Sequence, residues 1–238
     1  MNYYISLAVR KAKTVQRILS SGDYRGLKVG FKRNRHIIAK QIKAIPYYIF
    51  ADLEDRITGG RCTNGIIQSK YYNQGAYDLQ NSDYRCIEQL FQAIPLRPED
   101  VFVDAGCGEA RVITYLDRQG FHGRLIGVEL DEGIALRAAD RVAHCKNAEI
   151  INKNILNCSD VIAEGTAFFL FNPFNGYVLK SLIELIEKNE KNGVRLYYMC
   201  DYGRSLIDNR EGWRVLWRGQ VMRPPWTDLP ATIYEYSR

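Results

Sequence analysis

The chain has 238 residues, of which 46% are hydrophobic, and its formal net charge is +6. This length suits one α/β core with a small extension. No apolar run approaches the roughly 20 residues of a membrane span, and the N-terminus lacks the apolar core of a secretory signal. The six cysteines and three histidines form no ligand-like pairs, so we expect neither a membrane-spanning protein nor a disulfide framework nor a structural metal.

The first fifty residues are strongly basic. They contain eleven Lys or Arg and one acid, Asp23, so their net charge is +10 while the remaining residues sum to −4. Apolar residues at helical spacing predict a cationic amphipathic helix over Ile5–Leu19. Four roles remain open for residues 1–50: binding RNA phosphates, binding an anionic membrane surface, a cleavable presequence, or a structural cap. We treat 1–55 as a basic, mainly helical extension.

Residues 56–83 form a second unit, a connecting loop rich in Gly, Asn and Tyr. Polar and aromatic loops of this kind often carry function, although an ordinary linker is equally compatible with the composition. A helix is predicted over Ser82–Ile94, with Ser82 as its N-cap. Residues 84–238 are predicted to be the main α/β domain.

The most informative segment is an apolar strand, Val101–Val103, that runs into Asp104 and the glycines Gly106 and Gly108. A helix is predicted immediately afterwards, over Ala110–Leu116. Glycines at a strand-to-helix turn let a ligand approach the backbone. The dinucleotide spacing G-x-G-x-x-G fails, because its third glycine is replaced by Arg111.

A second apolar strand, within Arg124–Asp131, ends in acids about 20 residues beyond the glycines. Glu129 stands where a carboxylate can accept hydrogen bonds from the two hydroxyls of a ribose. After a predicted helix over Ile134–Cys145, a third strand is expected over Ala148–Ile155. It contains Asn154, a turn-forming residue type whose amide oxygen can also accept a hydrogen bond from a ligand.

The fourth strand, Ala167–Phe171, is apolar throughout, which is typical of a central strand buried on both faces. Asn172-Pro173-Phe174 then ends it at the edge where open α/β sheets bind ligands. Beyond it we predict one helix and three strands, with a turn-rich stretch at 223–230. Their expected bounds are Tyr177–Asn189 for the helix, and Val194–Cys200, Trp213–Val221 and Thr232–Tyr236 for the strands.

The series Asp-x-Gly-x-Gly-x-Ala at 104–110 resembles motif I of the class I S-adenosylmethionine-dependent methyltransferases. The resemblance covers roughly residues 80–238. It implies a Rossmann-like, mostly parallel sheet with an antiparallel C-terminal strand pair and helices on both faces. It also implies S-adenosylmethionine as cofactor, with the Asp104 carboxylate near its ammonium group. The residues implied in cofactor binding are Asp104, Gly106, Cys107, Gly108, Glu129, Leu130, Asn154, Ile155 and Asn172.

Asn172-Pro173-Phe174 is similar to the Asn-Pro-Pro-aromatic motif of methyltransferases that act on nitrogen, with one proline missing. The similarity implies that these three residues are catalytic: the Asn172 side-chain oxygen and the Pro173 carbonyl accept from the target nitrogen, and Phe174 stacks on a planar group. The alternative is a plain strand-ending turn with a core phenylalanine. By analogy with other class I enzymes, Tyr77, Gln80 or Ser82 closes the site from the preceding loop.

The sequence therefore predicts a methyltransferase that acts on a nitrogen of an acidic or surface-bound macromolecule, RNA or protein. Alternatives are an enzyme of small molecules or glycan precursors at a membrane surface, a non-catalytic S-adenosylmethionine-binding module, and, disfavoured by Arg111, a nicotinamide oxidoreductase. Scattered cysteines favour the cytoplasm, with peripheral membrane attachment left open. The methyl acceptor and the oligomeric state are not indicated.

Overall fold

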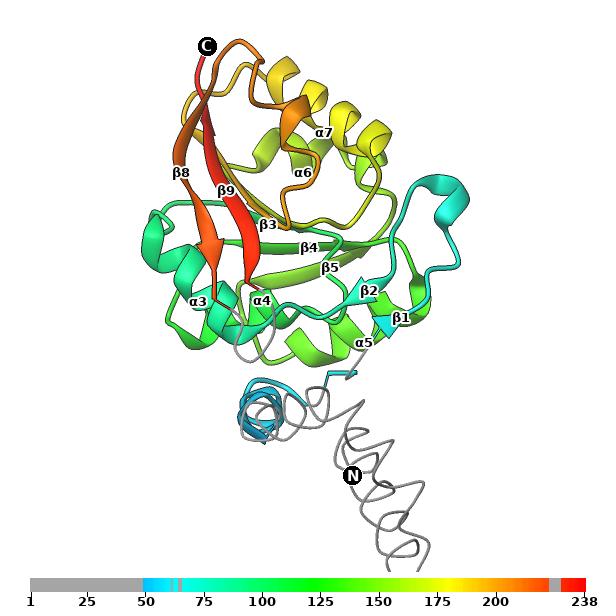
Figure 1. The fold of residues 1–238 in the computed structure, drawn as a ribbon. Helices are drawn as coiled ribbons and strands as arrows, with labels where there is room; N and C mark the ends of the chain where they lie inside the picture. Colours follow the sequence, from blue (N-terminus) through cyan, green and yellow to red (C-terminus); the bar gives the residue numbers. More distant parts are fainter. Residues whose placement is uncertain (1–48, 61, 64–65, 223–227) are drawn as a thin grey trace, which may run out of the picture.

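The structure, a computed structural model, describes residues 49–60, 62–63, 66–222 and 228–238 (Figure 1). The helix expected over Ile5–Leu19 and most of the turn at 223–230 lie outside these residues. A seven-stranded sheet forms the centre of the described part, in the order β5-β4-β3-β6-β7-β9-β8. Its strands are β3 (Phe102–Ala105), β4 (Leu125–Glu129), β5 (Ala148–Asn152), β6 (Ala167–Phe171), β7 (Val194–Met199), β8 (Trp213–Val221) and β9 (Leu229–Tyr236).

The sheet has the predicted mixture of directions. Strands β3 to β7 pair in parallel, whereas β9 runs antiparallel to both β7 and β8. The apolar run in β6 lies between β3 and β7, with Ala167 to Leu170 buried, as expected for a central strand. Since β3, β4 and β6 are parallel neighbours, the polar residues that follow them gather at one edge of the sheet.

Helices cover both faces of the sheet (Figure 1). Helices α6 (Ser159–Glu164) and α7 (Gly176–Lys188) pack on one face, where Val103, Ile126 and Phe168 contribute to the core. Helices α3 (Tyr84–Ala93), α4 (Arg111–Arg118) and α5 (Glu132–Val142) pack on the other, together with Phe102 and Phe169. The predicted fold class is therefore confirmed.

Short elements connect these layers. The 3₁₀ turns are η1 (Tyr72–Gln74), η2 (Ile155–Asn157) and η3 (Arg204–Leu206), and a two-stranded hairpin joins β1 (Ile66–Ile67) to β2 (Leu79–Gln80). Residues 49–57 are helical, so the boundary predicted at residue 55 falls inside this helix. Among the described residues, no helix has the length and apolar character needed to cross a bilayer.

Several predicted bounds differ from the structure by one to three residues, and three of the differences have a clear local cause. The N-cap of α3 is Asp83, not Ser82, because the Asp83 carboxylate accepts the Arg85 N–H at 3.0 Å. Strand β5 stops at Asn152, and Asn154 instead caps η2. Helix α5 begins at Glu132, two residues before the predicted start, because the Asp131 side chain caps it by accepting from the Ile134 N–H.

Candidate active site

A cavity opens at the carboxyl ends of β3, β4 and β6. Its wall includes residues of the loop at 104–110, which we call the glycine loop, and the end of β4. The turn after β5, the residues after β6 and the segment that contains η1 and β2 complete it. All but one of the residues predicted from the sequence for cofactor binding and catalysis lie on this wall. They are Asp104, Gly106, Cys107, Gly108, Glu129, Leu130, Asn154, Ile155, Pro173 and Phe174, while Asn172 is not part of it.

The glycine loop is tightly enclosed. Gly106 has φ +82° and Gly108 has φ +55°, values that L side chains rarely adopt. A Cβ on Gly106 would lie 2.5 Å from the Cβ of Pro173, and a Cβ on Gly108 would lie 2.3 Å from Cδ1 of Leu79. Gly106 therefore requires glycine for both backbone conformation and space, whereas at Gly108 the Leu79 methyl group can move and the positive φ is the main reason.

Asp104 is a buried carboxylate that faces the cavity. Among the described residues, none donates a hydrogen bond to its side chain. Burial and then the nearby Glu129 raise the pKa of Asp104 to about 8. A carboxylate in this state favours a cationic ligand, because a positive charge compensates the cost of ionising it in the protein interior.

Glu129 ends β4 and is held rigidly. One carboxylate oxygen accepts the Gly108 N–H at 3.0 Å and the other accepts the Asp131 N–H at 2.9 Å. Burial raises the pKa of Glu129, and these backbone hydrogen bonds partly offset the rise. Each oxygen keeps a further lone pair, so the oriented carboxylate can still accept from two vicinal hydroxyls.

Asn154 has a structural role that the sequence left open. Its side-chain oxygen accepts the Leu156 N–H at 3.0 Å and so caps η2. The residue also lies on the cavity wall beside Ile155. Contact with a base stays a prediction for Asn154, because its oxygen already holds one partner.

Asn172, Pro173 and Phe174 are positioned differently from one another. Asn172 adopts φ +42°, and its side-chain oxygen accepts from the Tyr198 hydroxyl at 3.4 Å. Pro173 and Phe174 line the cavity, but the Pro173 carbonyl already accepts the Tyr77 N–H at 2.9 Å. The Asn172 side-chain oxygen and the Pro173 carbonyl therefore each already accept a hydrogen bond from the protein. Their contacts to a target nitrogen stay predictions.

The segment before α3 covers the site. Ala76 forms an isolated antiparallel bridge to Phe174, and Gly75 accepts the Asn175 N–H at 2.8 Å. Tyr77, Gln80 and Ser82, which the sequence nominated for closing the site, all line the cavity. We call residues 66–82 the strap.

Glu109, inside the glycine loop, was not singled out by the sequence. It accepts from the Thr63 N–H at 2.5 Å, the Thr63 hydroxyl at 2.7 Å and the Asn81 amide at 2.8 Å, and it pairs with Arg137 at 2.9 Å. Burial opposes ionisation, but these hydrogen bonds outweigh it and lower the pKa of Glu109. The loop is thereby fastened to the strap and to α5.

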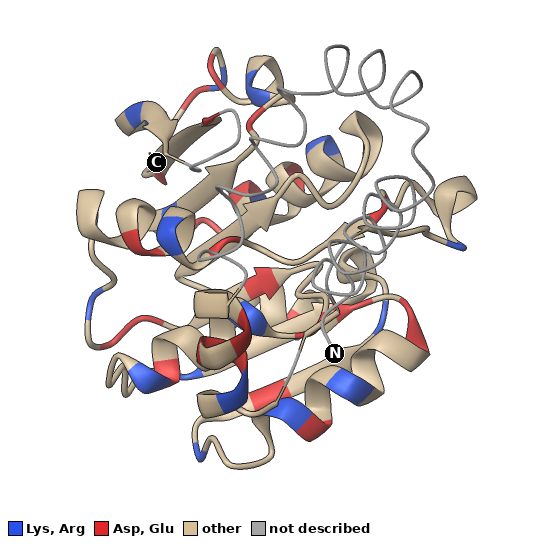
Figure 2. Cartoon of the chain, turned by 60° about the horizontal axis from the view of Figure 1, so that its bottom comes forward, with Lys and Arg blue, Asp and Glu red and all other residues tan. Residues whose placement is uncertain are grey.

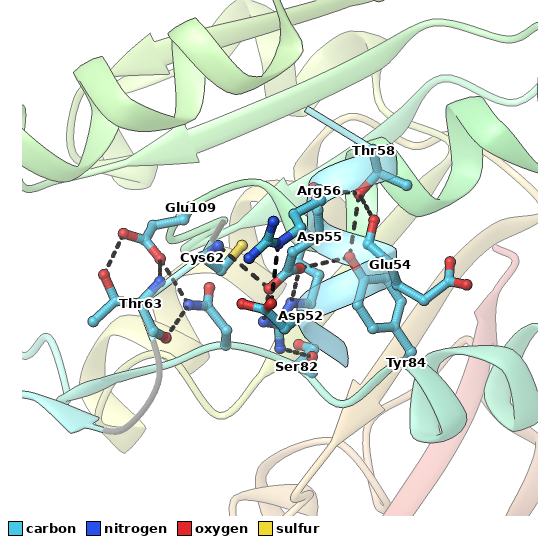
Figure 3. A network of polar contacts seen from close by, with 12 residues as sticks. Asp52, Glu54, Asp55, Arg56, Thr58, Cys62, Thr63, Ser82, Tyr84 and Glu109 are labelled. Atoms are coloured by element: carbon cyan, nitrogen blue, oxygen red, sulfur yellow. Dashed lines mark hydrogen bonds and ion pairs between the residues drawn. The ribbon is translucent and has the colours of Figure 1, made fainter. Parts of the chain in front are cut away.

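Behind the glycine loop lies a buried ionic network centred on Asp55 (Figure 3). Asp55 accepts from Arg111 of α4, from Arg141 of α5 and from the Tyr84 hydroxyl of α3. Arg111 also donates to the Ser82 carbonyl at 2.9 Å. The helix of residues 49–57 is thus joined to three helices of the main domain, and Arg111 is a buried structural residue.

Comparison with known proteins extends this description. No family model matches the chain. Over 105 residues, 43% of the chain, the sequence is 30% identical to ribosomal RNA small subunit methyltransferase A of Thermotoga petrophila. The match spans 39% of that relative's length, so the chain corresponds to only part of it.

Comparison with solved structures aligns a larger share of the chain. An rRNA methylase from Streptococcus thermophilus matches 64% of this chain and 95% of its own, with a TM-score of 0.50 and 18% identity. TrmN from Thermus thermophilus matches 63% of this chain and 48% of its own, with a TM-score of 0.54 and 10% identity. At such identities the likeness is one of fold.

The strand order, with a cavity at the carboxyl edge of the parallel strands, defines a Rossmann-like α/β domain. With the antiparallel β9 and β8 and the acids Asp104 and Glu129, this is the fold of the class I S-adenosylmethionine-dependent methyltransferases.

Proposed function

We propose that the chain is an S-adenosylmethionine-dependent methyltransferase that methylates a nitrogen of RNA. The observation that carries the proposal is Asp104, a buried carboxylate with a raised pKa and no hydrogen-bond donor among the described residues. It lies in one cavity with the oriented carboxylate of Glu129. This pair suits a ligand with an ammonium group at one end and a ribose at the other.

The cofactor supplies an activated methyl group on its sulfonium. In our proposal Asp104 pairs with the ammonium group, the loop from Gly106 to Gly108 holds the chain between amino acid and ribose, and Glu129 accepts from the ribose hydroxyls. Leu130, Asn154 and Ile155 border the base. Methyl transfer from such a donor needs alignment and exclusion of water more than a strong base, so the enclosed cavity suits it.

The acceptor side lies at Pro173 and Phe174, where the strap meets the end of β6. The Pro173 carbonyl has a second lone pair, and such a fixed dipole stabilises positive charge that develops on a nitrogen during alkylation. The Asn172 amide oxygen is not on the cavity wall, so it contributes only if its side chain turns away from Tyr198. Phe174 offers a ring for a planar group, which favours a nucleobase or amide nitrogen.

Two observations favour RNA. The curated relative that matches 105 residues of the chain methylates ribosomal RNA by its name. Lys, Arg, Asp and Glu are interspersed along the described part of the chain (Figure 2), whereas the excess of positive charge belongs to residues 1–50. A concentrated basic segment beside a nearly balanced domain suits a polyanion.

Exposed aromatic side chains surround the acceptor side. Tyr72 and Tyr77 of the strap are 56% and 43% exposed, Tyr177 at the start of α7 is 76% exposed, and Tyr202 after β7 is 71% exposed. The segments that carry them are adjacent: a Cβ on Gly75 would lie 2.8 Å from the Asn175 side chain, and one on Gly203 would lie 2.6 Å from Leu179. Tyrosines in this position can stack on unpaired bases.

Calorimetry with S-adenosylmethionine and S-adenosylhomocysteine tests the cofactor. The wild type binds both, whereas Asp104→Asn and Glu129→Gln each weaken binding by about tenfold or more. The control is Asp160→Asn, which changes an exposed acid in the first turn of α6 and leaves binding unchanged. Absence of binding to the wild type would refute the proposal.

Transfer of a labelled methyl group tests the acceptor. Total RNA, bulk protein, small amines and anionic-lipid extracts are offered separately, and nucleosides from the RNA are analysed for the labelled position. Label on a base nitrogen supports the proposal. Label in the protein or lipid fraction alone identifies another acceptor class, and cofactor binding without transfer to any fraction identifies a non-catalytic module.

A further inference from the structure

Three metal-binding side chains converge far from the candidate active site. Asp117 belongs to the last turn of α4, while His144 and Cys145 follow the end of α5. One ligand atom from each lies within 4.8 Å of the other two. None of the three lines the cavity at the glycine loop, so the cluster is separate from the proposed methyl-transfer site.

We propose that Asp117, His144 and Cys145 form a Zn²⁺ site. Nitrogen, sulfur and carboxylate oxygen are the ligands that Zn²⁺ takes in proteins, at bond lengths of about 2.0 to 2.3 Å. Tetrahedral coordination with these bonds places neighbouring donors roughly 3.2 to 3.8 Å apart. The Cys145 sulfur lies 3.5 Å from His144 Nε2, and that nitrogen lies 4.0 Å from the Asp117 carboxylate. Small side-chain rotations complete the geometry.

The local electrostatics favour a cation. Helices α4 and α5 both end at the cluster, and each carboxyl end carries partial negative charge. Of the neighbouring arginines, Arg118 pairs with Glu54, and Arg141 shares the charge of Asp55 with Arg111. Zn²⁺ binds cysteine as the thiolate, so binding at Cys145 releases the thiol proton.

The site has an open position. The His144 side chain is 51% exposed and Asp117 is 29% exposed, so an ion can enter from solvent, whereas Cys145 is buried beneath them. With three protein ligands, water occupies the fourth position. The metal would join the carboxyl ends of α4 and α5, and α4 begins directly after the glycine loop. We therefore assign the ion a stabilising role.

The sequence did not indicate this site, because His144 and Cys145 are adjacent and share no ligand spacing with another Cys or His. Asp117 lies in a different helix, 27 positions before His144 in the printed sequence. Only the packing of α4 beside α5 brings the three together.

The test uses the full chain after chelation. Calorimetric titration with Zn²⁺ is expected to give one equivalent and a raised melting temperature. Co²⁺ in its place gives a thiolate-to-cobalt charge-transfer band. Asp117→Asn, His144→Gln and Cys145→Ser each weaken Zn²⁺ binding by about tenfold or more, and the last abolishes the band.

Matched controls exclude other ligands. His122→Gln and Cys158→Ser change the same residue types outside the cluster and retain wild-type zinc affinity. Because His144 is half exposed, His144→Gln is expected to fold, which circular dichroism and cofactor binding verify. The proposal is wrong if the chelated wild type takes up no Zn²⁺, or if folded His144→Gln binds it as tightly as wild type.

Discussion

Arg111 and Asp55 form a buried, two-pronged ion pair across 56 positions of sequence, with Nε to Oδ1 at 3.0 Å and Nη2 to Oδ2 at 2.7 Å. Arg111 is the first residue of α4, directly behind the glycine loop. Arg111, which replaces the third glycine of the dinucleotide spacing, therefore joins the glycine loop to the helix of residues 49–57.

Breaking this pair is expected to destabilise the protein strongly. Asp55→Asn leaves Arg111 and Arg141 without their carboxylate in a buried site, and loss of one member of such a network costs about 3 to 5 kcal/mol. Urea denaturation measures the change. Arg56→Ala removes only an exposed pair with Asp52 and is expected to cost less than about 1 kcal/mol. Equal losses in the two variants would contradict the assignment.

The same pair shows where sequence reasoning ends. The main strands and the glycine loop were predictable, because each follows from a local pattern of apolar residues and turn formers, whereas the mostly parallel arrangement was implied by the family resemblance. The position of Glu129 beside the glycine loop was predictable because the carboxyl ends of parallel strands meet at one edge of the sheet. From the sequence, Arg111 only ruled out the dinucleotide motif. Its partner Asp55 is 56 positions away, and only the folded structure brings the two side chains together.

Glu109 and Asn172 show two further limits of sequence patterns. No local pattern distinguishes Glu109 from a solvent-exposed acid, yet Thr63, Asn81 and Arg137 all hold it. Asn172 follows a recognisable motif, but its side chain turns to Tyr198 because the residue adopts positive φ. A motif specifies which residues end a strand and leaves the direction of a side chain to the turn.

Ionisation of Asp104 is expected to make stability depend on pH. Its pKa is about 8 in the folded protein, compared with an ordinary value of 3.8, so the folded state binds the proton more tightly. The resulting stabilisation is complete below about pH 4 and is lost as pH rises through 8. Relative to Asp104→Asn, the wild type should lose at least about 1 kcal/mol between pH 5 and pH 8.5 in urea titrations.

A pH-independent difference between these two proteins would show that Asp104 titrates normally. Cofactor binding provides a second readout, because pairing with an ammonium group favours the ionised carboxylate. At pH 7 binding is expected to release a proton, so the calorimetric enthalpy varies with the ionisation enthalpy of the buffer. Asp104→Asn should remove that dependence.

Gly106→Ala is expected to abolish cofactor binding and to destabilise the protein by about 1 to 3 kcal/mol, because the new Cβ strains the backbone and overlaps Pro173. Gly120→Ala is the matched control: φ is +78°, but nothing lies within 4 Å of the added Cβ. It should show the backbone cost alone and normal cofactor binding. Loss of binding in both variants would mean that instability, rather than the cavity wall, is responsible.

Glu109→Gln tests whether fastening the strap matters for the cofactor. The change keeps the shape but removes the charge that Arg137 and the Thr63 and Asn81 donors satisfy, so we expect about tenfold weaker S-adenosylmethionine binding. Glu149→Gln changes an exposed acid on β5 and serves as control. Because the Glu109 pKa is lowered, its stabilising contribution is present above the unfolded pKa and disappears as pH falls through the folded value. Unchanged affinity would leave the strap as a purely structural cover.

The exposed tyrosines give the last prediction, which depends on an RNA acceptor. Tyr177→Ala combined with Tyr202→Ala is expected to raise KM for RNA at least about fivefold, because stacking contributes roughly 1 to 3 kcal/mol per base. Tyr177→Phe with Tyr202→Phe keeps the rings and should retain wild-type KM. Steady-state methylation kinetics measure both, and calorimetry verifies that cofactor affinity is unchanged. If removal of the rings leaves KM unaltered, the acceptor reaches Phe174 without contacting α7 or the loop after β7.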